Sequence, residues 1–528
     1  MNSTPQSLPE LLSRSALLYG HKRFAVDVAT RAELSFAGLD EASAVLARVL
    51  TTRLGLKPGQ HAAILMPNCL EILPAYFGIL RAGCVAVPIN ARLKSEELQF
   101  ILADCEAQAV FVHPATWKPA QEALKILNWQ APVIAACFEQ PPQGTVPFSE
   151  LLRANKEKRE ERSEKRARPI PRLTSHSSLL SSRQGVAAII YTSGTTGRPK
   201  GAMLTHGNIL FNIEATKAGH GLRGADVHLL VVPLFHVTGL NTIMPTALAQ
   251  GACLAVSSAI DPEELVETIH QFRCTTFFGV PTTFYLLANV KNLQLEKLSS
   301  LRLICYSGAP MSPLTIKRLR ELFPSSRVEL HNFYGLTETT SCTTVLPDSQ
   351  ALARAESVGL PPPGLELCVR DKAGQPLKPG EPGELCVRGP SVFKGYFKRP
   401  EATAAALAGG WFHTGDTACL DAEGYVFLRG REKEMIIVAG ENVYPIEVEN
   451  TLCAHPAVQE AAVFGRPDAV LGEVVHAAVV LRPGEQLAER ALKAFAHERL
   501  AAFKVPRTIR FLDRLPRNPS GKVLKRDL

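Results

Sequence analysis

Short apolar runs alternate with longer stretches of helical spacing through much of the chain. The apolar runs at residues 62–66 and 85–88 predict buried strands, and the stretch 71–82 between them predicts a helix. The same alternation resumes after a glycine-rich loop near residue 194 and continues to about residue 350. Strands that alternate with helices in this way favour the α/β class of fold.

The pattern changes in three places. Residues 143–184 are rich in proline, serine and charge, and predict an extended connection. After residue 350, short strand-like runs between glycine and proline turns predict a β-rich subdomain. From residue 433 a compact segment follows, with helices expected at 447–455 and 487–503 and a strand at 461–464. We therefore expect a large N-terminal domain over 1–432, made of two α/β subdomains and the β-rich one, and a small α+β C-terminal domain over 433–528.

Composition narrows the functional class only moderately. The chain has 528 residues, 46% of them hydrophobic and 20% charged, with a net charge of +8. Much of the positive charge lies at 153–172, where acidic residues interrupt it and no aromatics are interleaved, so we expect a solvated linker and no nucleic-acid partner. Contact of this segment with an anionic membrane surface is the alternative.

Targeting and cysteine patterns indicate the compartment. The N-terminus has no basic region followed by an apolar core, and no apolar run reaches the roughly 20 residues of a membrane span. Twelve cysteines are scattered with no Cys-x-x-Cys pair, which argues against a zinc site and against a disulfide framework. We expect a cytoplasmic protein, as a monomer or a homodimer.

The sequence YTSGTTGRPKG at residues 191–201 is the strongest chemical signal. It follows the apolar run 186–190, so a buried strand would end in a loop of glycines, hydroxyls and one lysine. Such a loop can hold phosphate through backbone N–H groups. It does not match the Walker pattern, which requires glycine where Pro199 stands. A second glycine pattern, GHGLRG at 219–224, follows a helical stretch and precedes a strand-like run, so we attribute it to chance.

Further motifs follow in order: SGAP at 307–310, FYGLTE at 333–338, WFHTGD at 411–416, GREKE at 430–434, AGENVYPIEVE at 439–449, FKVPR at 503–507 and PRNPSGKV at 516–523. Together with the glycine loop they resemble the signatures of the adenylate-forming enzymes, which include acyl-CoA synthetases, peptide-synthetase adenylation domains and luciferases. The chain is most similar to the acyl-CoA ligases. It departs from them at Ser307, where most relatives carry glycine, and in the long connection at 153–183.

This resemblance implies an ATP-dependent acid–thiol ligase that uses Mg²⁺ and CoA. The residues that it assigns to ATP and AMP are Thr192, Ser193, Gly194, Thr195, Thr196, Gly197, Lys200, Gly308, Ala309, Pro310, Asn332, Phe333, Tyr334, Gly335, Thr337, Asp416, Arg431 and Lys522. Those assigned to catalysis are Lys522, Thr337, Glu338 and Lys200, with Glu338 and Thr192 as magnesium ligands. Those assigned to the acyl group are Phe235, His236, Val237, Val280, Phe284 and Ser307. Gly440 and Lys504 are assigned to CoA, and Lys433 to the hinge of a mobile C-terminal domain.

The acid and the acceptor stay open at this level. The segments 235–239 and 278–283 are largely apolar and contain no lysine or arginine, which disfavours dicarboxylic acids. Medium-chain or long-chain fatty acids are therefore expected first, and aryl acids second. One alternative is a stand-alone adenylation enzyme that loads an acyl or aryl acid onto a carrier protein. A non-catalytic nucleotide-binding relative and a luciferase-like oxygenase are more remote alternatives.

Overall fold

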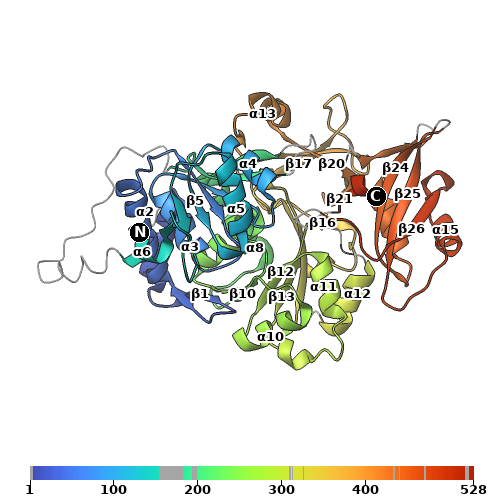
Figure 1. Ribbon diagram of the computed structural model, residues 1–528. Coiled ribbons are helices and arrows are strands. Elements are labelled where there is room, and N and C mark those ends of the chain that lie inside the picture. Colours follow the sequence, from blue (N-terminus) through green and yellow to red (C-terminus); the bar gives the residue numbers. More distant parts are fainter. Residues whose placement is uncertain are drawn as a thin grey trace, which may run out of the picture.

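The computed structural model describes residues 4–153, 182–192, 199–308, 311, 313–324, 326–431, 434–438, 441–468, 471–517 and 523–528. Within these residues the strands form four sheets (Figure 1). The predicted site residues that fall outside these ranges are Ser193, Gly194, Thr195, Thr196, Gly197, Ala309, Pro310, Gly440, Lys522 and the hinge residue Lys433. Most of the basic connection at 153–172 lies outside them as well.

The first sheet contains eight strands: β1 (Arg23–Asp27), β2 (Glu33–Ser35), β10 (Val227–Leu230), β11 (Cys253–Val256), β12 (Thr276–Gly279), β13 (Leu303–Tyr306), β14 (Glu329–Tyr334) and β15 (Thr344–Leu346). Their order is β15-β14-β13-β12-β10-β11-β1-β2, and the pairs from β14 to β1 are parallel. One face packs on α10 (Pro262–Phe272), α11 (Pro281–Ala288) and α12 (Pro313–Leu322), and the other on α8 (His206–His220) and α9 (Met244–Gln250).

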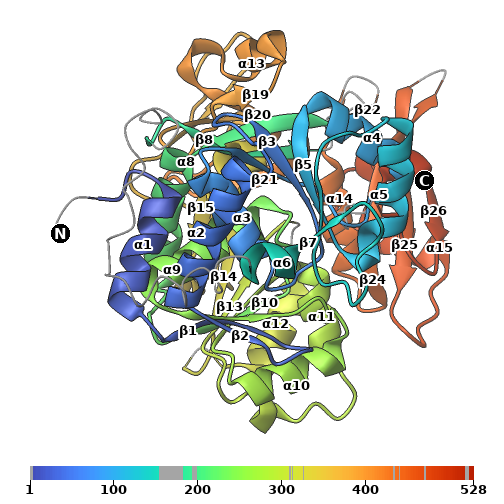
Figure 2. The ribbon, with the colours of Figure 1, turned by 60° about the vertical axis from the view of Figure 1, so that its left-hand side comes forward.

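The second sheet also contains eight strands: β3 (His61–Leu65), β4 (Val85–Pro88), β5 (Ala107–Val112), β6 (Val133–Ala135), β7 (Val146–Pro147), β8 (Val186–Thr192), β9 (Lys200–Thr205) and β19 (Gly395–Tyr396). Their order is β19-β9-β8-β4-β3-β5-β6-β7. Helices α1 (Leu8–Tyr19), α2 (Phe36–Thr52), α3 (Ile72–Arg81) and α6 (Phe148–Arg153) lie on one side, and α4 (Ser95–Asp104) and α5 (Pro114–Ile126) on the other (Figure 2). One continuous apolar core joins the two sheets.

Two smaller sheets complete the fold. The third is antiparallel and contains β16 (Ser357–Gly359), β17 (Glu366–Arg370), β18 (Gly383–Arg388), β20 (Phe412–Leu420) and β21 (Val426–Arg431), with α13 (Pro400–Ala406) beside it. The fourth contains β22 (Ile436–Val438), β23 (Glu441–Val443), β24 (Val458–Asp468), β25 (Gly472–Leu481) and β26 (Thr508–Phe511), packed with α14 (Pro445–Cys453) and α15 (Glu489–His497). This last unit has its own apolar core and lies at one side of the molecule (Figure 1).

Local chemistry explains where helices begin and end. Helix α10 begins after Asp261, whose carboxylate accepts the N–H groups of Glu263 and Glu264 at 3.0 and 3.2 Å. Helix α8 ends at Gly221, which adopts the left-handed conformation with φ +56°. The pattern GHGLRG is therefore a helix end followed by β10, which confirms that it is no dinucleotide-binding turn.

The mixed α/β class, the β-rich subdomain and the small C-terminal α+β unit are confirmed. Two expectations differ in detail. The connection expected from residue 143 contains helix α6 at its start, because Phe148 and Leu151 are buried against α2. The last expected helix is shorter than predicted, because Ala501 is extended after α15. No helix in the described part of the chain is long and apolar enough to span a bilayer.

Candidate active site

The carboxyl ends of four strands define the candidate site. Strands β10, β12, β13 and β14 run parallel, so the loops that follow them meet at one edge of the first sheet. Val280 begins the loop after β12 and Gly308 lies after β13. A Cβ atom built on Gly308, which has φ +85°, would lie 3.7 Å from Val280 Cγ1. The loop after β10 joins the loop after β14 through the hydroxyls of Thr238 and Ser341, 3.0 Å apart.

Gly335 shapes the loop that carries the predicted catalytic residues. A Cβ atom at this position would lie 1.2 Å from the carbonyl oxygen of Ser341, so no other residue fits without rebuilding the loop. The chain then forms a short 3₁₀ turn over Thr337–Thr339. This turn places Glu338 and the half-buried Thr337 directly beyond the end of β14.

Asp416 lies at the centre of a buried polar network. Its Oδ2 accepts a hydrogen bond of 2.6 Å from the Tyr334 hydroxyl, and its Oδ1 lies 3.0 Å from Nε of Arg431. The register of the third sheet creates the second contact, since Asp416 on β20 is paired with Arg431 on β21. Burial and the neighbouring carboxylate raise the pKa of Tyr334 well above its ordinary value, so its hydroxyl stays a donor. The carboxylate is thereby held rigidly at the site edge.

Tyr396, which no sequence motif marked, lies between Glu338 and Lys200 at the start of β9. Glu338 Oε1 accepts a hydrogen bond of 2.8 Å from the Tyr396 hydroxyl, and Lys200 Nζ lies 5.2 Å from the centre of the same Tyr396 ring. Burial raises the pKa of Glu338, and the hydrogen bond from Tyr396 opposes that effect. Tyr396 lies on a two-residue strand paired with β9, so no local pattern could mark it.

The donor set around Glu338 fits a magnesium ion. Glu338 offers a carboxylate and Thr192, at the end of β8, offers a hydroxyl, and such oxygen atoms are the ligands that Mg²⁺ takes. Among the described residues no lysine or arginine forms an ion pair with Glu338.

Other predicted ligands lie at or beneath this edge. Asn332 is buried and donates to the carbonyl of Ser357 at 3.1 Å, and Phe333 packs on Phe278 inside the core. The predicted acyl residues divide into three groups: His236 and Val280 are exposed, Phe235 and Ser307 are half-buried, and Val237 and Phe284 are buried in the two cores on either side. Val280, which is 50% exposed, is therefore the acyl-assigned residue that lies both at the surface and beside Gly308.

Lys504 has a local partner in this structure. Its Nζ lies 2.7 and 2.8 Å from the two carboxylate oxygens of Glu447 on α14. Its assignment to CoA stays a prediction, because a phosphate would have to compete with this pair.

The chain is similar to known proteins in both sequence and structure. Residues 12–397 match the family model of AMP-binding enzymes, and residues 447–522 match that of the AMP-binding enzyme C-terminal domain. A feruloyl-CoA synthase from an Amycolatopsis species is 36% identical over 494 residues, 93% of this chain and 92% of that protein. A long-chain-fatty-acid–CoA ligase of Escherichia coli O157:H7 is 34% identical over 545 residues, 99% of this chain and 94% of that protein. The crystal structure of an anthranilate CoA ligase in complex with anthranoyl-AMP superimposes with a TM-score of 0.88 at 27% identity, covering 99% of this chain and 96% of the other.

Proposed function

The chain belongs to the AMP-binding, adenylate-forming enzymes and is an acyl-CoA ligase that uses ATP, Mg²⁺ and CoA. We propose that its acid is a monocarboxylate with an apolar tail, most simply a medium-chain or long-chain fatty acid. The observation that carries the proposal is the exposed Val280 beside Gly308, at a sheet edge whose loops contain no lysine or arginine at 231–250, 276–290 or 303–311. A second carboxylate of the acid would find no lysine or arginine partner in these segments.

The reaction proceeds in two steps. A carboxylate oxygen of the acid attacks the α-phosphorus of ATP, the bond to pyrophosphate breaks, and acyl-AMP forms. The CoA thiol then loses its proton and attacks the acyl carbonyl carbon, and AMP leaves with the oxygen that had joined it to the acyl group. The first step brings an anion to a polyanion, so the protein has mainly to position the groups and to stabilise charge.

The described residues supply these functions as follows. Asp416, held by Tyr334 and Arg431, would accept the ribose hydroxyls and fix the nucleotide. Glu338 and the Thr192 hydroxyl would hold Mg²⁺, which when bound supplies positive charge to the phosphates. Thr337 lies beside Glu338 on the same turn and would donate to the α-phosphate.

Parts of this assignment depend on residues outside the described ranges. By resemblance, Lys522 would approach the α-phosphate in the first step, and Gly440 would enter with CoA in the second, after rotation about Lys433. The boundary between the third and the fourth sheet lies next to Lys433, since β21 ends at Arg431 and β22 begins at Ile436. We propose 1–432 and 433–528 as the two moving bodies.

A competition assay over an acid panel tests the choice of acid. We expect kcat/KM for acyl-AMP formation to rise with chain length by up to about fourfold per methylene, since each buried methylene contributes about 0.8 kcal/mol, until the pocket ends. Malonate and oxalate should be poor substrates. A preference for malonate over octanoate would contradict the proposal.

A matched pair of variants connects this result to the site. Val280→Lys places a cation at the proposed tail surface and should reduce octanoate turnover while improving malonate relative to it. Ile126→Lys, which is 61% exposed on α5 away from the sheet edge, is the control and should change neither. Equal effects of the two variants would mean that Val280 does not face the acid.

An aryl acid is the second candidate, favoured by the 36% identity to a feruloyl-CoA synthase. A higher kcat/KM for ferulate or benzoate than for any fatty acid in the panel would select it. A carrier protein as the acceptor is a further alternative, and thioester formation on a holo-carrier but not on CoA would select that one.

A further inference from the structure

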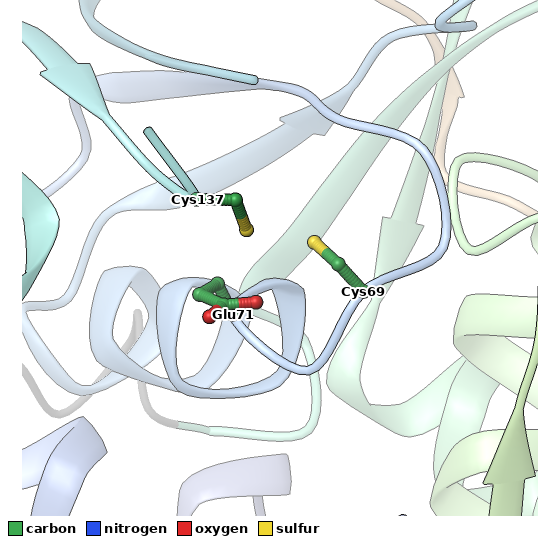
Figure 3. Close-up of side chains that lie close together, drawn as sticks. All are labelled: Cys69, Glu71 and Cys137. Carbon is green, nitrogen blue, oxygen red and sulfur yellow. The ribbon is translucent and has the colours of Figure 1, made fainter. Parts of the chain in front are cut away.

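Three potential metal ligands from two segments meet beyond the carboxyl ends of strands β3 and β6 of the second sheet. Cys69 lies in the loop after β3, Glu71 is the residue before α3, and Cys137 follows β6. The two sulfur atoms and a carboxylate oxygen all lie within 4.8 Å of one another. Figure 3 shows the three side chains pointing toward a common point.

The group is accessible from one side only. Cys69 is 6% exposed, Glu71 is half-buried and Cys137 is exposed, the only exposed cysteine among the twelve. Cys137 also adopts φ +61°, which is uncommon for a residue with a side chain. The strained conformation turns its sulfur toward Cys69 rather than along the strand direction.

No lysine or arginine in the described part of the chain forms an ion pair with Glu71, whose carboxylate accepts a hydrogen bond from the Cys137 thiol and faces the ring of His113. A divalent cation would displace the thiol protons and bind the same sulfur and carboxylate atoms. The start of α3 contributes only a partial positive charge.

We propose that Cys69, Glu71 and Cys137 form a binding site for a thiophilic divalent cation, Zn²⁺ being the expected one. Two thiolates and one carboxylate are a suitable set for this ion, with a water molecule in the fourth position on the side of Cys137. The scattered cysteine spacing argues against such a site at the level of sequence, because the two cysteines come from segments far apart along the chain.

A comparable group elsewhere contains a histidine that pairs with the carboxylate. Glu384, Cys386 and His413 also lie within 4.8 Å of one another, but there Nδ1 of His413 is 2.7 Å from Glu384 Oε2. The other Glu384 oxygen accepts the N–H of Gly415 at 3.0 Å. Those hydrogen bonds account for the second group without an ion, and it serves as an internal control.

Metal binding at Cys69 would restrain a loop that supports the acid site. The neighbouring Asn68 accepts the N–H of Leu234 at 2.7 Å and donates to the carbonyl of Ser257 at 3.0 Å. These contacts fix the segment that leads into Phe235 and His236. We therefore expect the metal-loaded protein to be more stable to heat than the metal-free protein.

The direct test uses the full-length, reduced, metal-free protein and Zn²⁺ alone. Because Cys137 is the exposed cysteine, its alkylation rate can be followed at the peptide level by mass spectrometry. Stoichiometric Zn²⁺ should slow this alkylation by about tenfold or more, since a bound thiolate is withdrawn from reaction. An unchanged rate would overturn the proposal without any need for a variant.

Variants assign the ligands. Zn²⁺ affinity is measured by competition with a chromophoric chelator, and Cd²⁺ is added to record thiolate-to-metal absorption. Cys69→Ser and Cys137→Ser should each lower the affinity by about a hundredfold or more and weaken the Cd²⁺ absorption. Glu71→Gln should lower the affinity but keep the absorption, and Cys386→Ser should change neither.

Two results contradict this site. Tight Zn²⁺ binding that survives in Cys69→Ser and is lost in Cys386→Ser would place the ion at the other group. A Cys69–Cys137 disulfide in the unreduced protein, together with no Zn²⁺ binding after reduction, would identify the pair as a redox pair instead of a metal site.

Discussion

Tyr334→Phe removes one oxygen atom from the network that holds Asp416. The lost contact is a buried hydrogen bond of 2.6 Å to a carboxylate. Hydrogen bonds to charged groups contribute about 1.5–3 kcal/mol, so the carboxylate should lose that much restraint while its contact with Arg431 remains. If Asp416 binds ribose, kcat/KM for ATP should fall by about tenfold to a hundredfold, mainly through KM.

The assay is ATP–pyrophosphate exchange with ATP varied and the acid held at saturation. Unfolding of both proteins is measured in parallel, because part of the free energy appears as stability. The KM for the acid should stay close to that of the wild type, since Tyr334 contacts the carboxylate of Asp416 and not the acyl loops.

Tyr306→Phe is the matched control. Tyr306 is a buried tyrosine on the adjacent strand β13, paired in register with Asn332, and within the described residues its hydroxyl has no hydrogen-bond partner. Removing that hydroxyl should leave the KM for ATP unchanged and should not lower stability. The reasoning is refuted if both variants change KM equally, or if Tyr334→Phe loses stability with no change in KM for ATP.

Three further predictions concern other parts of the protein. Tyr396→Phe removes the hydrogen bond that lowers the pKa of Glu338. Half-maximal activity should then require more Mg²⁺, and the acid side of the pH profile of kcat/KM should move to higher pH. An unchanged pH profile contradicts this prediction. Burial lowers the pKa of His228 to about 4, so as pH falls below 6.5 the unfolded state takes up a proton before the folded state does. The contribution of this group to the free energy of unfolding should therefore be constant above pH 7.5 and fall by about 3 kcal/mol towards pH 4. Denaturant titrations of the wild type and His228→Phe measure that slope, which the variant should reduce. Lys522→Ala should remove most adenylation but spare thioester formation from supplied acyl-AMP, and equal loss in both half-reactions would give the lysine another role.

Motifs that follow a strand directly are the ones whose position in the fold could be predicted from the sequence. Gly335 and Glu338 lie in the loop after β14, at the edge where the parallel strands bring their carboxyl ends together. Asp416 and Arg431 belong to two motifs 15 residues apart, and the register of the β20–β21 hairpin brings them together. The order of the motifs along the chain does not determine that register.

Other features depend on contacts that local patterns do not encode. Tyr334 was assigned to the nucleotide from its motif, and the motif did not reveal that its hydroxyl donates to Asp416. Tyr396 reaches Glu338 from a segment 58 residues away along the chain. The convergence of Cys69 and Cys137 depends on the order of strands β3, β5 and β6, which spacing alone cannot give.

Isotope transfer from a doubly ¹⁸O-labelled carboxylic acid tests the central claim, that the acid itself attacks the α-phosphorus of ATP before CoA is acylated. With labelled octanoate, ATP, Mg²⁺ and CoA, the AMP released should carry one ¹⁸O atom and the acyl-CoA should keep the other. Label in inorganic phosphate together with ADP, or unlabelled AMP with both ¹⁸O atoms still in the free acid, would contradict the account.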